Sequence, residues 1–274
     1  MFNHVSQAVQ SIWRKTAFRP DIAIILGTGL GNLTKRVKTE AVISYQSIPH
    51  FPRSTVPSHA GRLVFGTMGN KRVVIMDGRF HYYEGYTLEQ VTFPVRVLRK
   101  LGARILIVSN AAGGLNLTYK KGDLVLIEDH INLMGVNPLV GPNDDRLGVR
   151  FPDMSEPYSR RLIDFAEKAA RHHHIPLKRG VYVGVSGPCL ETSAEYRFMQ
   201  KLGADLVGMS TVPEVIVGVH AGFEILGISV VTDLCDPDHL KPVNIEEIIQ
   251  TAVHAGPKLD LLVESVVIKL PHVD

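Results

Sequence analysis

Residues 78–85, GRFHYYEG, hold the densest cluster of chemically capable side chains in the chain. They follow RVVIM (72–76), a run typical of a buried strand, and α/β proteins bind ligands where such strands end. Arg79 suits planar recognition of a phosphate, and His81 can face the same anion. Tyr83 adds a flat aromatic face and a hydroxyl. This density favours a binding or catalytic role over an ordinary charged loop.

Other segments with capacity for chemistry also follow apolar runs. GTGLG (27–31) can bind an anion through its backbone N–H groups, or it is a plain tight strand exit. It is not a dinucleotide fingerprint, because Asn32 stands where GxGxxG needs glycine. NAAGG (110–114) allows close approach of backbone to a ligand. In GMSTVPE (208–214), the hydroxyls either cap a helix or bind phosphate.

Two acidic segments raise the question of what their carboxylates do. Glu191 in GPCLET (187–192) lies at a helix start, where it is a favourable first-turn anion or an acceptor for a purine or amide edge. Asp233 lies in TDLCDPD (232–238), which lacks the spacing of an EF-hand loop. The histidines of RHHHI (171–175) face different directions on a helix. The sequence therefore predicts no metal site.

The elements that must position these groups alternate between strands and helices. Helices are predicted at 3–17, 87–102, 158–174, 193–202, 213–222 and 245–268, and Pro94 should kink or shorten the second. Strands are predicted at 22–26, 62–66, 72–76, 105–109, 123–127, 181–186, 205–209 and 224–231. This alternation predicts an α/β fold with a largely parallel or mixed sheet. The absence of repeats and linkers favours one domain over residues 1–274.

The composition excludes several classes of protein. Apolar residues make up 45% and charged residues 21% of the 274, which is ordinary for a globular protein. The net charge of +3, with acids and bases interspersed, argues against a nucleic-acid binder. Two cysteines give no disulfide framework, and no apolar stretch is long enough to span a bilayer. We expect a cytoplasmic protein without nucleic-acid or membrane partners.

The segments taken together resemble one family, the trimeric purine nucleoside phosphorylases, whose relatives include the methylthioadenosine phosphorylases. The resemblance runs from about residue 20 to about residue 265. It rests on segments that follow in family order: RSTVPSHAGRL (53–63), GRFHYYEGY, TFPVRVLRKLGA, SNAAGGLN, GDLVLIEDHINL, GPND, FPDMSEPY, GPCLET, KLGADLVGMSTVPEVI and the TD at 232–233. The joint match is specific, whereas no single motif is.

The resemblance implies a fold, a reaction and a set of roles. The fold would be a central mixed β-sheet, partly closed to a barrel and flanked by helices, as in phosphorylase/hydrolase-like proteins. Inorganic phosphate would attack the anomeric carbon of a purine nucleoside, releasing the free base and ribose 1-phosphate. No metal or organic cofactor is expected. The family is a homotrimer with its site near a subunit interface, and Phe151 matches a residue lent by the neighbouring subunit.

The roles carried over by motif position fall into three groups. The phosphate-binding group is Thr28, His59, Arg79, His81, Ala111 and Ser210. The nucleoside-binding group is Tyr83, Ala112, Phe151, Leu190, Glu191, Val207, Met209, Thr232, Asp233 and Ile245. The residues expected to take part in catalysis are Asp233, His81 and Glu191, with Glu191 at the N1 side of the purine and Asp233 at N7 and the 6-substituent.

Three positions depart from the inosine/guanosine pattern of this family. Asp233 replaces an asparagine, and an ionised aspartate only accepts hydrogen bonds, which suits a 6-amino group. Ile245 aligns with a histidine near the ribose 5′-hydroxyl, and Leu190 replaces a phenylalanine. The first two departures point toward methylthioadenosine or adenosine as substrate.

The sequences GRFHYYEG and RSTVPSHAGR match the inosine/guanosine branch. Cys235 stands where the methylthioadenosine branch has a second aspartate. We therefore expect an inosine/guanosine phosphorylase with an altered base pocket. A nucleoside hydrolase that uses water and a non-catalytic purine-binding protein are the alternatives from other classes.

Overall fold

The computed structural model describes residues 1–27, 31–53 and 60–271. Its nine strands form one mixed sheet in the order β2-β3-β4-β1-β5-β8-β7-β6-β9, and β5 also pairs with β9. The strands are β1 (Ile22–Ile25), β2 (Lys38–Ser44), β3 (Arg62–Met68), β4 (Lys71–Asp77), β5 (Ile105–Gly114), β6 (Leu124–Asn132), β7 (Leu177–Gly184), β8 (Leu206–Gly208) and β9 (Glu224–Leu234). Because β5 pairs with both β8 and β9, the second half of the sheet closes on itself as a barrel. The predicted mixed sheet, partly closed to a barrel, is confirmed.

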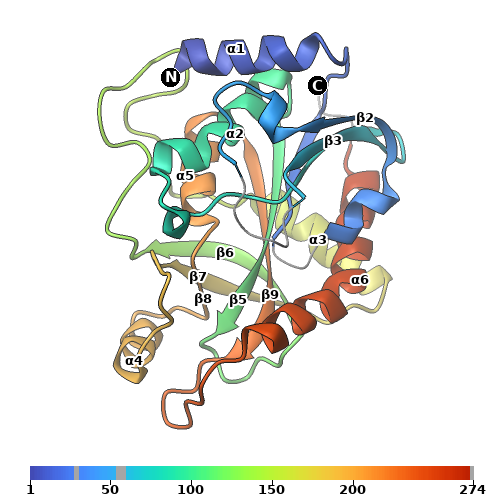
Figure 1. Ribbon diagram of the computed structural model, residues 1–274. Helices are drawn as coiled ribbons and strands as arrows, with labels where there is room; N and C mark the ends of the chain where they lie inside the picture. The colour runs from blue at the N-terminus through green and yellow to red at the C-terminus, as the bar shows by residue number, and fades with distance from the viewer. Residues whose placement is uncertain (28–30, 54–59, 272–274) are drawn as a thin grey trace.

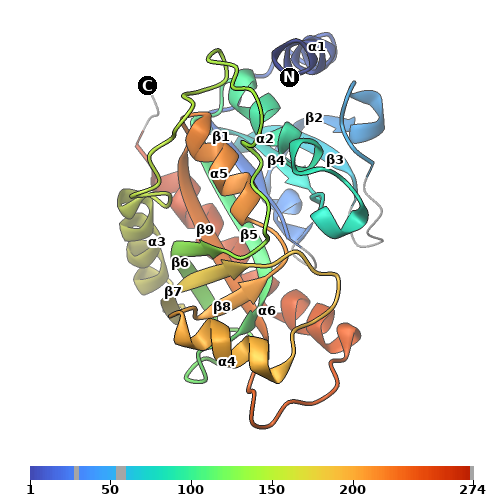
Figure 2. The same ribbon diagram turned by 90° about the vertical axis from the view of Figure 1, so that its left-hand side faces the viewer.

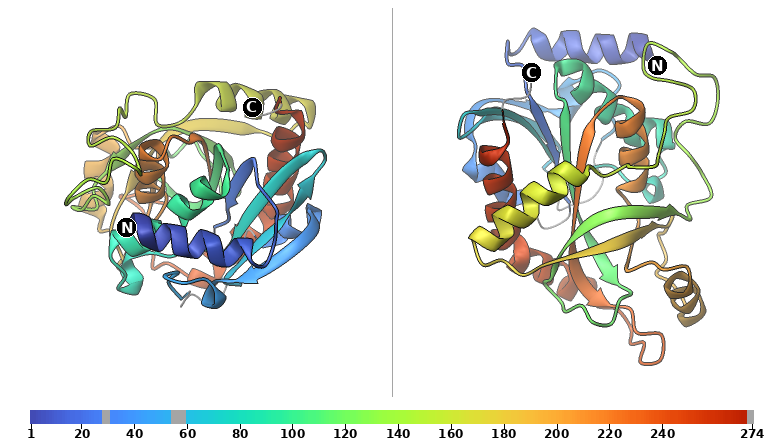
Figure 3. Two further views of the ribbon diagram at one scale, coloured as in Figure 1. Left: turned by 90° about the horizontal axis from the view of Figure 1, so that it is seen from above. Right: turned by 180° about the vertical axis from the view of Figure 1, so that it is seen from behind.

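Helices lie on both sides of the long central strands. They are α1 (Phe2–Trp13), α2 (Leu88–Leu101), α3 (Arg160–His172), α4 (Ser193–Lys201), α5 (Val212–His220) and α6 (Ile245–Lys269). Figure 1 and the right view of Figure 3 show α2 and α5 on one side of β5 and β9, with α3 and α6 on the other. None of these helices, in the part of the chain that the structure describes, has the length and apolar content to span a bilayer.

The central strands are apolar because both of their faces are covered. All four residues of β1 are buried, and β1 pairs in parallel with β4 on one side and β5 on the other. β5 in turn runs parallel to β9 along its whole length. The carboxyl ends of β4, β5 and β9 therefore meet at one edge of the sheet. That edge is where an α/β sheet binds its ligand.

Two sequence expectations differ from the structure. The prediction that Pro94 kinks or shortens its helix was wrong about the length, since α2 runs on from Leu88 to Leu101. Proline removes a single backbone donor, and the buried residues on both sides of Pro94 hold the helix in place. Strand β2 was missed because it is mostly exposed and lies at the end of the sheet, paired with β3 alone.

Side chains cap the starts of α4 and α6. Thr192 accepts a hydrogen bond from the backbone N–H of Glu195, whose carboxylate bonds back to the N–H of Thr192, so α4 begins with a capping box. Asn244 accepts from the N–H groups of Glu246 and Glu247 at the start of α6. In Figure 2, α4 and the first turns of α6 lie near the end of the barrel. Residues 187–192, just before α4, and residues 245–249, at the start of α6, therefore lie near that end as well.

Candidate active site

A cavity of about 500 Å³ opens at the edge where β4, β5 and β9 end. Its walls come from the segment after β4, from the last residues of β5, β8 and β9, from the segments that flank these strands, from α4 and the segment before it, and from the start of α6. The lining residues are Arg79, His81, Tyr83, Asn110, Ala111, Ala112, Gly113, Leu190, Glu191, Tyr196, Val207, Gly208, Met209, Ser210, Thr232, Asp233, Cys235, Ile245, Ile248 and Ile249. One end of the cavity carries basic and hydroxyl groups, and another part carries two carboxylates.

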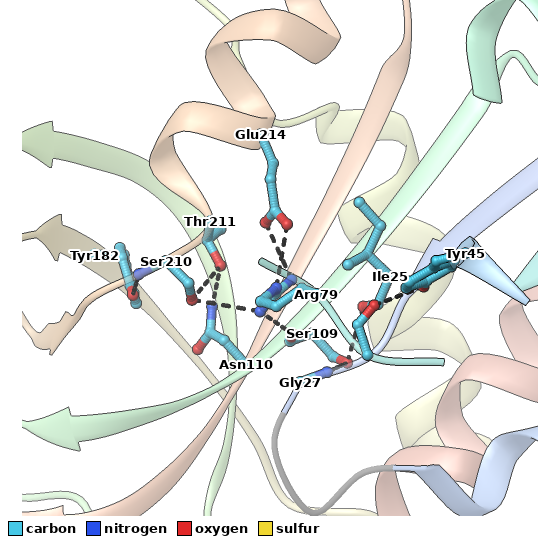
Figure 4. Close-up of polar contacts among 11 residues, drawn as sticks. Ile25, Gly27, Tyr45, Arg79, Ser109, Asn110, Tyr182, Ser210, Thr211 and Glu214 are labelled. Atoms are coloured by element: carbon cyan, nitrogen blue, oxygen red, sulfur yellow. Dashed lines mark hydrogen bonds and ion pairs between the residues drawn. The ribbon is translucent and has the colours of Figure 1, made fainter. Parts of the chain in front are cut away.

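Arg79 is the buried cation of the basic end. Its Nε lies 3.1 Å from Oε1 of Glu214, and its Nη2 lies 3.1 Å from Oε2 of the same carboxylate. Its Nη1 donates to the carbonyl of Ser109 at 2.8 Å and to Oγ of Ser210 at 3.3 Å, as Figure 4 shows. The side chains of Arg79 and Glu214 are 1% and 4% exposed. A charge buried so deeply is stable only when it is paired, so Glu214 fixes both the charge and the orientation of Arg79.

A strained turn aims Ser210 at this cation. Thr211 has φ 65° and ψ −54°, and the N–H of Val212 donates to the carbonyl of Ser210 at 2.7 Å. These values describe a γ-turn of the rare, strained kind. Thr211 gives no side-chain cap to α5, because its hydroxyl accepts from Nδ2 of Asn110 at 2.8 Å. The start of α5 thus has no hydroxyl cap from Thr211, and the positive end of its helix dipole lies beside Ser210 and Arg79, where it favours an anion.

His81 is held in place by its own short turn, Tyr82–Glu84. Glu84 accepts from the backbone N–H of His81 at 2.8 Å and lies 2.9 Å from its Nδ1. The imidazole stacks on the ring of Tyr83 with centroids 4.7 Å apart. These contacts fix the ring plane at the wall of the cavity, next to the basic end. Tyr83 itself is partly exposed and lines the same wall.

Asp233 is one of the two carboxylates. Its Oδ1 accepts from the hydroxyl of Thr232 at 2.9 Å, and its Oδ2 accepts from the thiol of Cys235 at 3.6 Å. The backbone is closely packed here, since a Cβ on Gly113 would lie 2.5 Å from Sγ of Cys235. Glycine at 113 therefore lets Cys235 lie beside Asp233.

Glu191 is the second carboxylate, and its surroundings raise its pKa above the usual value. Burial raises the pKa of Glu191, the charges of Glu195 and Asp233 raise it further, and a hydrogen bond with Tyr196 lowers it. Tyr196 is buried, and burial raises the pKa of its hydroxyl as well. Glu191 and Asp233 thus face one cavity with different hydrogen-bonding partners.

Three isoleucines form an apolar rim on the first turn of α6. Ile245, Ile248 and Ile249 all line the cavity, because residues three and four apart share one face of a helix. Leu190, from the segment before α4, lies on the same cavity. This rim can contact an apolar group of a ligand but offers it no hydrogen bond.

The structure brings most of the predicted site residues together. The predicted residues that line the cavity are Arg79, His81, Tyr83, Ala111, Ala112, Leu190, Glu191, Val207, Met209, Ser210, Thr232, Asp233 and Ile245. Thr28 and His59 lie outside the described residues. Phe151 lies apart from the cavity of its own chain, and 85% of its surface is exposed. Within the described ranges, no group of three or more His, Cys, Asp or Glu side chains is arranged to hold a metal ion.

Sequence reasoning missed several residues of the site. Glu214 was not singled out, although it lies in the quoted GMSTVPE, because its pairing with Arg79 spans 135 positions. Ile248 and Ile249 were missed although their helical spacing from Ile245 was a usable signal. Asn110 was quoted only as part of NAAGG, and Tyr196 carried no signal that separated it from an ordinary helix residue.

Comparison with known proteins gives one consistent family. The model of the phosphorylase superfamily matches residues 21–268. Purine nucleoside phosphorylase 1 of Geobacillus stearothermophilus is 51% identical over 90% of this chain and 90% of its own length. Purine nucleoside phosphorylase of Mus musculus is 48% identical over 93% of this chain and 91% of its own.

A solved structure of Schistosoma mansoni purine nucleoside phosphorylase superposes with a TM-score of 0.94 at 41% identity, covering 99% of this chain and 98% of that one. The likeness in sequence and the likeness in structure extend over nearly the whole chain. The chain therefore belongs to the phosphorylase superfamily and, within it, to the purine nucleoside phosphorylases.

Proposed function

We propose that this enzyme catalyses the phosphorolysis of purine ribonucleosides and deoxyribonucleosides to free base and (deoxy)ribose 1-phosphate. The observation that carries the proposal is one cavity that joins a buried arginine and a serine hydroxyl to two carboxylates. The arginine and the serine hydroxyl suit an inorganic phosphate, and the two carboxylates suit the polar edge of a purine. The relatives named purine nucleoside phosphorylase support the same reaction.

Phosphate is the co-substrate, and we place it at the basic end. Arg79, His81, Ser210 and the backbone N–H of Ala111 would bind it, together with Thr28 and His59. Arg79 supplies the charge, and the positive end of the α5 helix dipole adds to it. This placement holds phosphate close to the anomeric carbon of a nucleoside whose base reaches Glu191 and Asp233.

The reaction requires the enzyme to stabilise opposite charges on the two sides of the bond that breaks. As the bond between base and sugar lengthens, the ribose gains positive charge and the purine gains negative charge. The phosphate on one face of the ribose stabilises the first, with Tyr83 and Met209 lining the sugar. Glu191 would accept a hydrogen bond from the N1 side of the purine, and Asp233 in its protonated form would donate one at N7 or the 6-position to the leaving base. Ala112, Val207, Leu190, Thr232 and Ile245 complete the nucleoside-binding wall.

The base is proposed to be hypoxanthine or guanine. Structures of Schistosoma purine nucleoside phosphorylase contain inosine, guanosine or hypoxanthine, which supports this class. The second candidate is an adenosine or methylthioadenosine phosphorylase. Two observations favour it: Asp233 accepts hydrogen bonds at both oxygens, and the rim of Ile245, Ile248 and Ile249 suits an apolar 5′ group. One relative structure contains adenosine.

The oligomeric state, the metabolic role and the cellular location are proposed from the resemblance. We infer a homotrimer whose site lies near a subunit interface, with Phe151 reaching the site of a neighbouring chain. Its high exposure in one chain is consistent with a contact of this kind. The enzyme would act in purine salvage in the cytoplasm, without a metal or an organic cofactor.

The test is release of base from inosine, guanosine, adenosine and methylthioadenosine, each with and without phosphate. Release that depends strictly on phosphate supports phosphorolysis, whereas release in water alone shows a hydrolase. Binding of base with no release from any of the four shows a non-catalytic protein. Light scattering of the purified chain measures the trimer, and treatment with a chelator measures the need for a metal.

A further inference from the structure

A short row of hydrogen bonds ends at the hydroxyl of Ser210, at the basic end of the cavity. Nδ2 of Asn110 donates to Oγ1 of Thr211 at 2.8 Å, and this Oγ1 lies 3.3 Å from Oγ of Ser210. Nη1 of Arg79 donates to the same Oγ, also at 3.3 Å. Figure 4 shows the row, with the nitrogen of the Asn110 amide facing Thr211. Two side chains that the proposed function leaves out, Asn110 and Thr211, thus lead to one that it places against phosphate.

The donors in this row set the direction of its hydrogen bonds. An amide nitrogen only donates, so the hydroxyl of Thr211 accepts from Asn110 and keeps its own proton for another acceptor. Thr211 is fully buried, and the other side chain that the described structure places within hydrogen-bond distance of its hydroxyl is Ser210. If Thr211 accepted from Ser210 as well, its buried proton would have no acceptor, which is costly. Thr211 therefore donates to Ser210.

Ser210 is left with its proton as the group that it can offer to the cavity. A hydroxyl has one proton and two lone pairs, and Oγ of Ser210 accepts from both Arg79 and Thr211. The same side chain lines the cavity, so the free direction of its proton is toward the ligand. An ionised oxygen of phosphate fits this donor, whereas a second donor does not.

We propose that Asn110, acting through Thr211, orients the hydroxyl of Ser210 as a hydrogen-bond donor to phosphate. This inference rests on the proposed function, which places phosphate at Arg79 and Ser210. A donor that is already oriented does not have to reorganise when the anion binds, and this strengthens binding. Asn110 and Thr211 act through Ser210 and are therefore positioning residues.

The experiment measures the KM for phosphate and the KM for inosine in Asn110→Asp, at about pH 8, where a carboxylate is ionised. The carboxylate has nearly the shape of the amide but accepts the proton of Thr211, so Thr211 accepts the proton of Ser210 in turn. Phosphate then meets a lone pair of Ser210 in place of a proton. We expect the KM for phosphate to rise at least about tenfold, the factor for a lost hydrogen bond to a charged group, and the KM for inosine to change less.

The new carboxylate also repels phosphate by its charge, so Asn110→Asp is combined with two changes at Thr211 in double-mutant cycles. Thr211→Val keeps the shape and removes the hydroxyl, which disconnects residue 110 from Ser210. In that background the rise in the KM for phosphate caused by Asn110→Asp should be about tenfold smaller, because repulsion alone remains. Thr211→Ser keeps the hydroxyl, so the full rise should remain in that background.

A KM does not depend on how much of a preparation is folded, and Thr211→Ala replaces the valine variant if that one does not fold. The inference is overturned if Asn110→Asp leaves the KM for phosphate unchanged, or if it raises the KM for inosine equally. It is also overturned if the rise is the same with and without a hydroxyl at position 211. Failure of the proposed function looks different, because the wild type would then release no base in response to phosphate.

Discussion

Replacing Glu214 by alanine removes the carboxylate that pairs with the buried guanidinium of Arg79. Both contacts of this pair are 3.1 Å long, and both side chains are almost fully buried. Breaking a buried pair by removing one partner costs about 3–5 kcal/mol, because the remaining charge stays desolvated. Arg79 would keep its contacts with Ser109 and Ser210. We therefore expect a loss of stability near the lower end of this range.

The assay is urea unfolding of wild type and Glu214→Ala, with and without phosphate. If phosphate binds at Arg79, it supplies the variant with a replacement counter-ion, so phosphate should stabilise the variant more than the wild type. A ligand at 100 times its Kd adds about 2.7 kcal/mol to stability, which is enough to be measured. Because greater stabilisation at the same phosphate concentration means tighter binding, catalysis should show a lowered KM for phosphate with a smaller change in the KM for nucleoside.

The matched control is Glu167→Gln, which breaks an ion pair with Arg179 on the surface, where the two side chains are 28% and 44% exposed. Surface pairs contribute about 0–1 kcal/mol, and this change should not alter the response to phosphate. If Glu214→Ala is no less stable than the control, or if phosphate stabilises it no more than the wild type, the assignment of Arg79 as the buried phosphate-binding cation is wrong.

Three further predictions concern the base, the sugar and the pH dependence. Asp233→Asn should raise turnover of inosine relative to adenosine, since an amide can donate to O6; an unchanged ratio would show that Asp233 does not contact the base. Ile245→His should lower the ratio of the KM for inosine to the KM for 5′-deoxyinosine by about threefold to tenfold, which corresponds to one hydrogen bond. Equal changes in the two KM values would show that the 5′ group does not lie near residue 245. Burial raises the pKa of Asp260 from 3.8 to about 6, so its contribution to stability is largest below pH 3.8 and is lost as pH rises through 6. Asp260→Asn should therefore raise Tm at pH 8 more than at pH 5, and the opposite order would contradict the reasoning.

The sequence predicted the parts of the fold that depend on local pattern. Apolar runs identified β1 and β5, and a helix was predicted at 193–202, where α4 lies. β2 escaped because an exposed strand at the end of a sheet has no apolar run. α2 was expected to be shortened because the rule for Pro94 concerns an isolated helix, whereas tertiary packing maintains the buried one.

The candidate site shows the same contrast between features that depend on local sequence and features that depend on long-range contacts. Residues that lie in the quoted motifs, such as His81 and Asp233, line the cavity that the structure describes. The contacts that orient them were not predictable, because they join distant segments: Arg79 meets Glu214 across 135 positions, and Asn110 meets Thr211 across 101. Tyr196 and Cys235 became part of the site only when the structure placed both on the wall of the cavity.

Strand β5 also sets how the enzyme can fold. Ile105–Val108 pair with β1 in the open part of the sheet, and Gly113 and Gly114 pair with β8 in the barrel. The residues between them, Asn110–Ala112, line the active site. A partly folded chain with only one of the two parts formed would thus have an incomplete cavity. Nucleoside binding should therefore appear in refolding experiments together with the last long-range strand pairing, and no earlier intermediate should bind the ligand.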